Sequence, residues 1–336
     1  MNCVSHLSIS NAARSLLGLT ITMKSRQAAS TFLVLLLMSG GCSPRGTELN
    51  AVRRGDEAFA QDNFEEALAE YRLAVRQGAD DPTITARVAH TYAVMGRVDD
   101  SGAYYRDAAA REPDLIDQAV ADLIRLAQNA HSSDDLFAMA TAIEVALELL
   151  PGIGVGPLSL PLARHYFTNG EYGRALPFYQ KAMDDAADSV PEIVFEVGQA
   201  HEEIGDCNHA LVFFEQFRDM VPPWERGEVD WYIGTCAFYM ARELRSQAVE
   251  PAELFQALEF IDRTVEVGEP RNIQAQAWFE KGEILSELGD CQRAMESYLQ
   301  VRYADQADPL IERSQSRFDE IRFGTGLEHL RNGRCR

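Results

Sequence analysis

Hydrophobic positions along this chain recur at helical spacing, and short polar turns separate the helical stretches. The stretch from Pro191 to Trp224 shows the pattern most clearly. On either side of Gly205 and Asp206, apolar and small residues return every three or four positions, as on the buried face of an amphipathic helix. Pro222 and Pro223 follow the second helical stretch. The pattern predicts two helices joined by a tight turn, and such a pair cannot bury its apolar face alone.

The same spacing recurs in five segments. Counting from a small residue in the first helix, a turn residue follows after seven positions, a small residue after twelve, an aromatic residue after sixteen and a packing residue after nineteen. The small residues from which these spacings are counted, called anchors below, are Gly55, Ala89, Ala163, Gly198 and Gly282. The turn residue is glycine in four segments, and Asp62 takes its place in the first. Five copies with one spacing predict a stacked array of helix pairs.

Two further segments follow the helix-pair pattern less regularly. They run from Ile116 to Pro151 and from Gly227 to Pro270. The second contains an insertion around residues 242–251, which we expect either to lengthen a helix or to bulge a loop. From Pro309 onward an amphipathic stretch predicts a helix that covers the last pair, as terminal repeats require.

The regular segments resemble the tetratricopeptide repeat (TPR). That family has Trp, a Leu-Gly pair and Tyr on the first helix, then Ala, an aromatic residue and Pro on the second. Trp278, Leu288 and Gly289 fit this pattern in one copy, and Tyr92 and Pro113 fit it in another.

The resemblance implies an all-α, right-handed solenoid of about seven TPR-like hairpins with a C-terminal capping helix. Hairpins 1–3 are expected over residues 48–151, a Gly-rich linker over 152–157, hairpins 4–7 over 158–308, and the capping helix and tail over 309–336.

The N-terminal segment is typical of a secretory signal. Lys24 and Arg26 precede an apolar run from Ala28 to Met38, and small residues follow. The apolar run is short for a membrane-spanning helix. Residues 1–41 are therefore predicted to be a targeting segment, with Met23 as a possible true start.

The end of this segment, Leu37 to Cys42, resembles a bacterial lipobox. The resemblance implies cleavage before Cys42, lipid attachment to that residue, and a lipidated tether over residues 42–47. It also implies a periplasm-facing protein, at the outer membrane rather than the inner one because Ser43 is not an aspartate. Ser39 stands where leucine is usual, and ordinary signal cleavage remains the alternative.

Four further cysteines are consistent with export. Cys207, Cys236, Cys291 and Cys335 are an even number, and they allow three pairings. We expect Cys207 to pair with Cys236 and Cys291 with Cys335, because neighbouring hairpins touch and distant ones do not. The alternative is that these cysteines are small buried hydrophobic residues.

The charge excludes one class of partner. The formal net charge is −21, with 52 acidic and 31 basic residues among 336. An acidic surface repels phosphate backbones, so no nucleic acid is expected as a partner.

Candidate chemistry is sparse, and the best cluster is the run of His201, Glu202, Glu203, Asp206, Cys207, Asn208 and His209. Histidines and a carboxylate are metal ligands, but the two histidines are eight residues apart and no HExxH or CxxC spacing occurs. His201 stands where the family has Tyr, and we expect it to pack between hairpins. We therefore predict no metal, no cofactor and no catalytic residue.

The remaining candidate for a functional site is the surface formed by the first helices. In TPR arrays the first helices line a concave groove that receives a peptide or a partner helix. Aromatic residues three before or four after the anchors are predicted to line it: Phe59, Phe167, Phe195, Trp231, Phe238 and Phe279. Such a groove on an acidic body favours an apolar or basic segment of another protein. The alternative is that these rings pack between helices.

The function predicted from these features is that of a non-enzymatic scaffold, an envelope lipoprotein that binds another protein. Its layout resembles that of TPR lipoproteins in outer-membrane β-barrel assembly and type IV pilus assembly. The alternatives are a periplasmic protein that captures a small ligand or cell-wall fragment, and a metal-dependent enzyme around His201 and His209.

Overall fold

The computed structural model describes residues 44–185, 191–305, 309–324 and 335, with side chains from residue 49 onward. Within these residues the chain forms fifteen α-helices and no strand. The helices are α2 (Pro44–Phe59), α3 (Phe64–Arg76), α4 (Pro82–Val94), α5 (Val98–Arg111), α6 (Ile116–Ser132), α7 (Leu136–Leu149), α8 (Ser159–Thr168), α9 (Tyr172–Asp185), α10 (Pro191–Glu203), α11 (Cys207–Met220), α12 (Gly227–Gln247), α13 (Pro251–Val267), α14 (Arg271–Glu287), α15 (Cys291–Ala304) and α16 (Leu310–Phe323).

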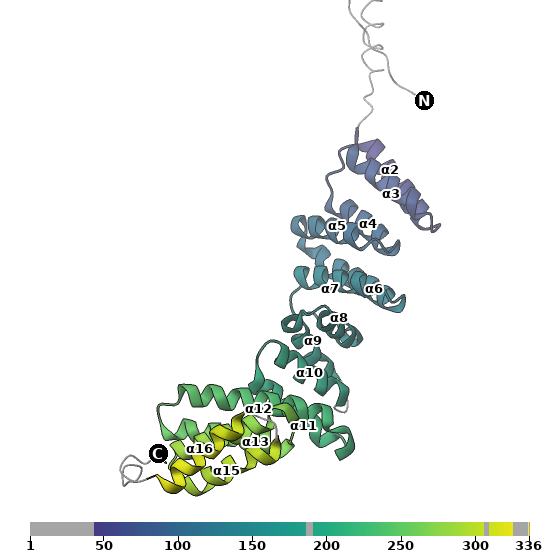
Figure 1. Ribbon diagram of the computed structural model, residues 1–336. Coiled ribbons are helices and arrows are strands. Elements are labelled where there is room, and N and C mark those ends of the chain that lie inside the picture. The colour runs from purple at the N-terminus through teal and green to yellow at the C-terminus, as the bar shows by residue number, and fades with distance from the viewer. Residues whose placement is uncertain (1–43, 186–190, 306–308, 325–334, 336) are drawn as a thin grey trace, which may run out of the picture.

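Consecutive helices pack as seven hairpins, from α2 with α3 to α14 with α15, and α16 follows the last hairpin. The hairpins stack into a long column that bends near α12, and its two ends lie far apart (Figure 1). The hydrophobic core is accordingly a row of clusters, each shared by neighbouring hairpins. The predicted all-α solenoid of about seven hairpins with a final helix is confirmed.

The anchors are small residues because an aromatic ring of the paired helix packs directly against them. A Cβ atom at Gly198 would lie 2.6 Å from the ring of Phe214 on the paired helix. Gly55 and Gly282 meet Tyr71 and Tyr298 in the same way. In each of these hairpins the anchor on the first helix faces the aromatic residue on the second helix. This contact explains why the two residues are always sixteen positions apart in the sequence.

The turn residues take the left-handed conformation that reverses the chain. Gly205 has φ 79°, and Asp62 has φ 59°. Asp134 has φ 61° and makes the same turn in hairpin 3, where the sequence shows no glycine. Aspartate is one of the few residues besides glycine that enter this region.

The insertion after Arg242 lengthens a helix. It extends α12 to Gln247, which makes α12 the longest helix described, with 21 residues. Arg245 near its end forms ion pairs with Glu280, Glu283 and Glu287 of α14. The insertion therefore ties hairpin 6 to hairpin 7.

The last helix packs on α15 where the first helix of a next hairpin would lie. Arg317 Nε of α16 donates to Glu283 Oε1 of α14 over 2.7 Å. Farther along the chain, Cys335 is buried against α14, because its N–H donates to the Ser286 carbonyl and the Ser286 hydroxyl donates back to the Cys335 carbonyl. The C-terminal end of the stack is therefore covered.

The N-terminal predictions lie mostly outside the described residues. The targeting segment and Cys42 fall within residues 1–43, while α2 already begins at Pro44, inside the stretch expected to be a tether. None of the helices described has the length and apolar character needed to cross a membrane.

Candidate functional site

The six aromatic residues predicted to line a groove do not form one surface. Phe238 and Phe279 are 3% and 6% exposed, so the prediction is wrong for these two. Phe59, Phe167 and Phe195 are half-buried against rings of the paired helices, namely Phe64 for Phe59, Tyr172 and Tyr179 for Phe167, and Phe214 and Phe217 for Phe195.

The geometry of the helix explains why these predicted groove residues are buried or half-buried. Positions three before and four after an anchor share the anchor's face, and that face packs against the second helix of the same hairpin.

The outer faces of the first helices carry a polar ladder instead. The residue directly after an anchor bonds to the first helix of the next hairpin, or to α16 at the end. The five pairs are Asp56 with Arg87, His90 with Asp122, Arg164 with Glu196, Gln199 with Tyr232 and Glu283 with Arg317. The polar residue after each anchor is a sequence signal for this ladder, but its partner depends on how the next hairpin is stacked.

Asp122 is the most buried member of the ladder. Its Oδ2 lies 2.7 Å from His90 Nδ1 and also accepts from the Tyr105 hydroxyl, while Arg125 pairs with Oδ1. Burial alone would raise the pKa of the Asp122 carboxyl, but the hydrogen bonds from His90 and Tyr105 and the charges of His90 and Arg125 lower it below its usual 3.8. Burial and the hydrogen bond to Asp122 raise the pKa of Tyr105.

Among the described residues, the ladder has no pair from α6 to α8 and none from α12 to α14. Thr235, which follows the anchor-like Gly234, donates to the Trp231 carbonyl of its own helix rather than to α14. Trp231 and Tyr239 are 44% and 61% exposed, and with Thr235 they stand at intervals of four residues, which places them along one stripe. We call Trp231, Thr235 and Tyr239 the α12 stripe. Of its three residues, Trp231 was predicted to line the groove, and Thr235 and Tyr239 were not.

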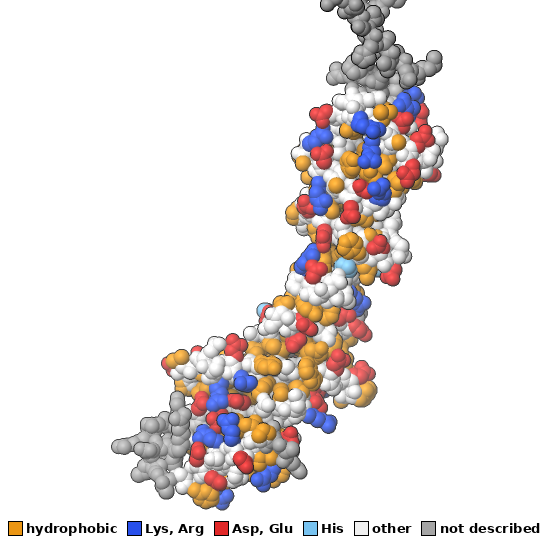
Figure 2. Space-filling view, turned by 45° about the horizontal axis from the view of Figure 1, so that its top comes forward, with side chains coloured by type: hydrophobic (Ala, Val, Ile, Leu, Met, Phe, Trp, Pro, Cys, Tyr) orange, Lys and Arg blue, Asp and Glu red, His pale blue; other side chains and the backbone are white. Residues whose placement is uncertain are grey.

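Acidic side chains border the α12 stripe. Glu228 lies three residues before Trp231 and Glu243 four residues after Tyr239, spacings that keep them on the same side of the helix. Neither forms an ion pair within the described part of the chain. Over the face seen in Figure 2, acidic and basic side chains are interspersed, and hydrophobic side chains gather near the bend of the column.

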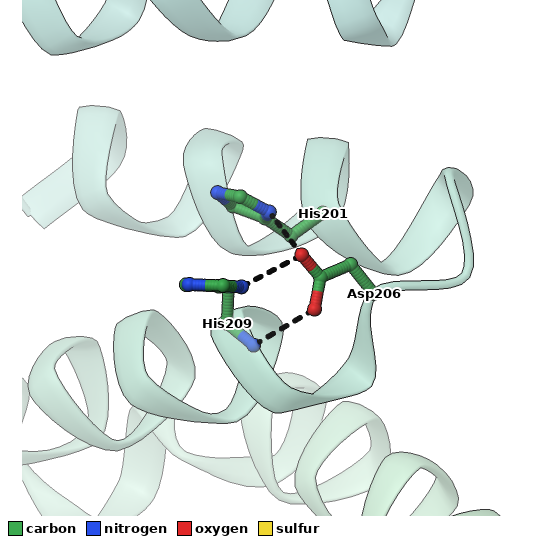
Figure 3. Close-up of side chains that lie close together, drawn as sticks. All are labelled: His201, Asp206 and His209. Atoms are coloured by element: carbon green, nitrogen blue, oxygen red, sulfur yellow. Dashed lines mark hydrogen bonds and ion pairs between the residues drawn. The ribbon is translucent and has the colours of Figure 1, made fainter.

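The structure also brings together His201, Asp206 and His209, although the two histidines are eight residues apart in the sequence (Figure 3). His201 lies near the end of α10, Asp206 caps α11, and His209 lies in the first turn of α11. The tight turn at Gly205 returns the chain, so the two imidazole rings stack with centroids 5.2 Å apart. The end of α10 and the start of α11 lie side by side because the turn between them is tight. Residues that are eight positions apart in the sequence are therefore neighbours in space.

The two oxygens of Asp206 have different partners. Oδ1 accepts from the His209 backbone N–H over 3.2 Å, which is the helix cap. Oδ2 lies 2.7 Å from His209 Nδ1 and 3.4 Å from His201 Nδ1. The pKa of His201 is lowered, mainly by burial, so its imidazole is neutral at pH 7.

The cysteines lie in the pairs expected from the sequence. Cys207 is joined to Cys236 and Cys291 to Cys335, with Cα atoms 5.3 and 5.4 Å apart. The first pair links α11 to α12, and the second links the start of α15 to the residue held by Ser286. Oxidation of these thiols in the native protein stays a prediction, and peptide mapping can test it.

Comparisons with known proteins identify the repeats. Models described as tetratricopeptide repeat match residues 52–116 and 275–308. The chain therefore contains tetratricopeptide repeats, a class of helical repeat that binds other proteins or peptides. Neither match indicates an enzyme family, and no curated protein sequence matches the chain.

Solved structures of TPR proteins are similar to this chain at low identity. The C-terminal part of a TPR repeat-containing protein from Cytophaga hutchinsonii is 13% identical, with 78% of this chain and 98% of that chain covered and a TM-score of 0.33. YrrB, described as a TPR protein with an unusual peptide-binding site, is 16% identical over 63% of this chain and 97% of its own, with a TM-score of 0.32. PilF from Pseudomonas aeruginosa is 14% identical over 81% and 98%, with a TM-score of 0.28.

Proposed function

We propose that this protein is a non-enzymatic scaffold of the bacterial cell envelope that binds a segment of another protein along its first helices. The observation that carries the proposal is the α12 stripe. Two large aromatic side chains stay exposed there, on a face that α2, α4, α8, α10 and α14 use for the ladder. Tryptophan and tyrosine are the residues that most often anchor protein partners.

The chemistry of the partner follows from the border of the stripe. Glu228 and Glu243 carry negative charge on either side of the aromatic pair, and the whole chain has a formal charge of −21. A segment with an apolar centre and flanking Lys or Arg residues would complement both features. Figure 1 places α12 at the bend of the column, where a partner segment can approach from the side.

Photocrosslinking in the envelope tests the proposal. A photoreactive residue in place of Tyr239 should give one reproducible protein adduct. The matched control replaces Val212, a similarly exposed apolar residue on α11, the second helix of hairpin 5. An adduct at 239 and none at 212 supports the scaffold. A co-purifying small molecule with no protein adduct would instead favour the alternative of a small-ligand or cell-wall-fragment binder.

Membrane attachment belongs to the same proposal and is tested separately. We propose that Cys42 carries a lipid that holds the protein at the periplasmic side of a membrane, the outer one rather than the inner. Cys42→Ser should abolish fatty-acid labelling and release the protein into the soluble fraction, and Cys3→Ser should change neither. Membrane retention of Cys42→Ser, with no label in either form, would exclude the lipid anchor.

We propose that the scaffold serves the assembly of an outer-membrane, pilus or secretion complex. The layout of a targeting segment followed by TPR hairpins is similar to that of lipoproteins in outer-membrane β-barrel assembly and in pilus assembly. The crosslinked partner would assign the pathway directly.

A further inference from the structure

We infer that His201, Asp206 and His209 form a binding site for one divalent transition-metal ion, with zinc as the ion that the donor set fits best. Two imidazole nitrogens and one carboxylate oxygen are a common ligand set for zinc. One ligand atom from each of the three residues lies within 4.8 Å of the other two.

The present distances are close to those that a tetrahedral ion needs. With zinc–ligand bonds of about 2.0–2.1 Å, neighbouring ligand atoms lie roughly 3.3–3.4 Å apart. His201 Nδ1 and Asp206 Oδ2 are already 3.4 Å apart. His209 Nδ1 must move away from its 2.7 Å contact with Asp206 Oδ2 and toward His201. It is free to do so because the His209 side chain is 66% exposed.

Helix capping accounts for the position of Asp206, but it does not account for the two histidines next to it. Asp135 and Asp290 cap α7 and α15 as Asp206 caps α11, by accepting a backbone N–H three residues on. Among the described residues, no histidine forms an ion pair with Asp135 or Asp290. Asp206 also keeps Oδ2 outside the cap bond, so that oxygen can bind an ion while Oδ1 holds the helix.

The buried nitrogen of His201 is the second observation that points to a ligand. Its Nδ1 is buried and has no hydrogen-bond partner, since the 3.4 Å approach of Asp206 lacks hydrogen-bond geometry. A buried polar atom without a partner is costly, and a bound ion would satisfy it. The ring is held in place by stacking on Phe213 and His209, so this nitrogen keeps its direction toward Asp206 (Figure 3).

A metal ion at this site would link the two helices of hairpin 5. His201 comes from the end of α10, whereas Asp206 and His209 belong to the start of α11, so one ion joins both helices across the turn. Three protein ligands leave one tetrahedral position, and the exposure of His209 means that this position faces solvent. Cys207 lies next to Asp206 but its sulfur is bonded to Cys236, so it is not available as a ligand in the oxidised protein.

The test is a zinc titration of the purified mature protein, stripped of metal and kept without reductant. We expect one equivalent of Zn²⁺ to bind and to raise the melting temperature. In Asp206→Asn the affinity should fall at least tenfold, while the helix cap is kept because asparagine caps as well as aspartate. His209→Asn should lose affinity to a similar degree, and this exposed position leaves folding intact.

The matched control is His131→Asn, which removes an exposed histidine near the end of α6. It should bind zinc as the parent chain does. Cobalt substitution gives an independent readout, since tetrahedral Co²⁺ absorbs strongly in the visible range and this band should vanish in His209→Asn. Absence of stoichiometric zinc binding would overturn the inference. So would binding that Asp206→Asn and His209→Asn leave unchanged. Because none of these variants touches the α12 stripe, failure here leaves the scaffold proposal standing.

Discussion

Gly234 lies directly against the backbone of the segment that connects α13 to α14. A Cβ atom at this position of α12 would lie 1.7 Å from the backbone carbonyl oxygen of Glu269, which cannot rotate away as a side chain could. We expect Gly234→Ala to lower the free energy of unfolding by about 3 kcal/mol, at the upper end for overpacking.

The control for this prediction lies on the same helix. A Cβ atom at Gly227 meets nothing within 4 Å, so Gly227→Ala should be neutral or slightly stabilising. Urea unfolding of both variants measures the difference. Equal stability of the two would mean that hairpins 6 and 7 pack less closely than described.

Asp122 makes stability depend on pH. Its folded pKa is lowered, so the stabilisation from its carboxylate is fully present above the unfolded value of about 3.9 and is lost as the pH falls through the folded pKa. Asp122→Asn should lower the free energy of unfolding by about 1–3 kcal/mol at pH 7 and by less at pH 3.5.

Urea unfolding at the two pH values checks this sign. Asp117→Asn, an exposed change on the same helix, serves as the control and should cost well under 1 kcal/mol at either pH. A loss for Asp122→Asn that grows on acidification would contradict the assigned pKa direction.

At this scale the sequence predicted the packing residues but not the polar contacts. Anchors and rings are sixteen residues apart within one hairpin, so local spacing is enough to find them. The bond between His90 and Asp122 joins two hairpins, and it depends on how far each helix is rotated, which no spacing reveals. The predicted groove residues are covered for a different reason, because their positions share the anchor's face, which packs against the second helix of the same hairpin.

Among the helices, α12 carries the clearest departure from the regular repeat. Its extra turns place Arg245 among Glu280, Glu283 and Glu287, whose side chains are mostly buried. Arg245→Met would leave these carboxylates without their shared cation. We expect a loss of about 1–3 kcal/mol, less than for a fully buried pair because water still reaches the group.

Arg242→Met is the matched control for α12. Arg242 is exposed, and its one described contact is with the ring of Phe238 at 5.6 Å. Its replacement should cost about 0.5 kcal/mol or less. If Arg245→Met were equally mild, the insertion would not be the tie between hairpins 6 and 7.

The second disulfide gives a prediction for α15 and the segment that returns to it. Cys291 and Cys335 close a loop with a sequence separation of 44 residues. Loop-closure entropy predicts a loss of roughly 3–4 kcal/mol for Cys291→Ser. Peptide mapping without reductant should recover Cys291 linked to Cys335 and Cys207 linked to Cys236. Scrambled pairs would contradict the stacking order of the last hairpins.

The whole column should not unfold in one step. Each hairpin contacts only its neighbours, so stability is a sum of local terms. Both disulfides lie between α11 and residue 335, and none of the described residues before α11 is crosslinked. In hydrogen exchange at moderate urea, amides of α2–α5 should exchange before those of α12–α15. A reductant should shrink that difference, whereas simultaneous exchange of all hairpins would disprove it.

The fold of the whole molecule could be predicted because it repeats. Five copies of one spacing predicted helix hairpins. Hairpins 3 and 6 were predicted because their less regular segments lie between the regular ones. The histidine cluster was a candidate from the sequence, but the contacts of both imidazole rings with Asp206 Oδ2 depend on the geometry of the turn at Gly205. The α12 stripe was found only in part, with Trp231 named and Tyr239 missed, since the interrupted ladder that exposes it depends on the neighbouring hairpin.

The covered C-terminal end also bears on how such a chain can grow in evolution. A hairpin duplicated after α15 would need the surface that α16 now occupies, and Arg317 would lose Glu283 as its partner. A hairpin inserted earlier in the column would leave that closing contact intact. New repeats are therefore expected inside the array or at its N-terminal side, and related chains of different length should share α14, α15 and α16 as a fixed terminal unit.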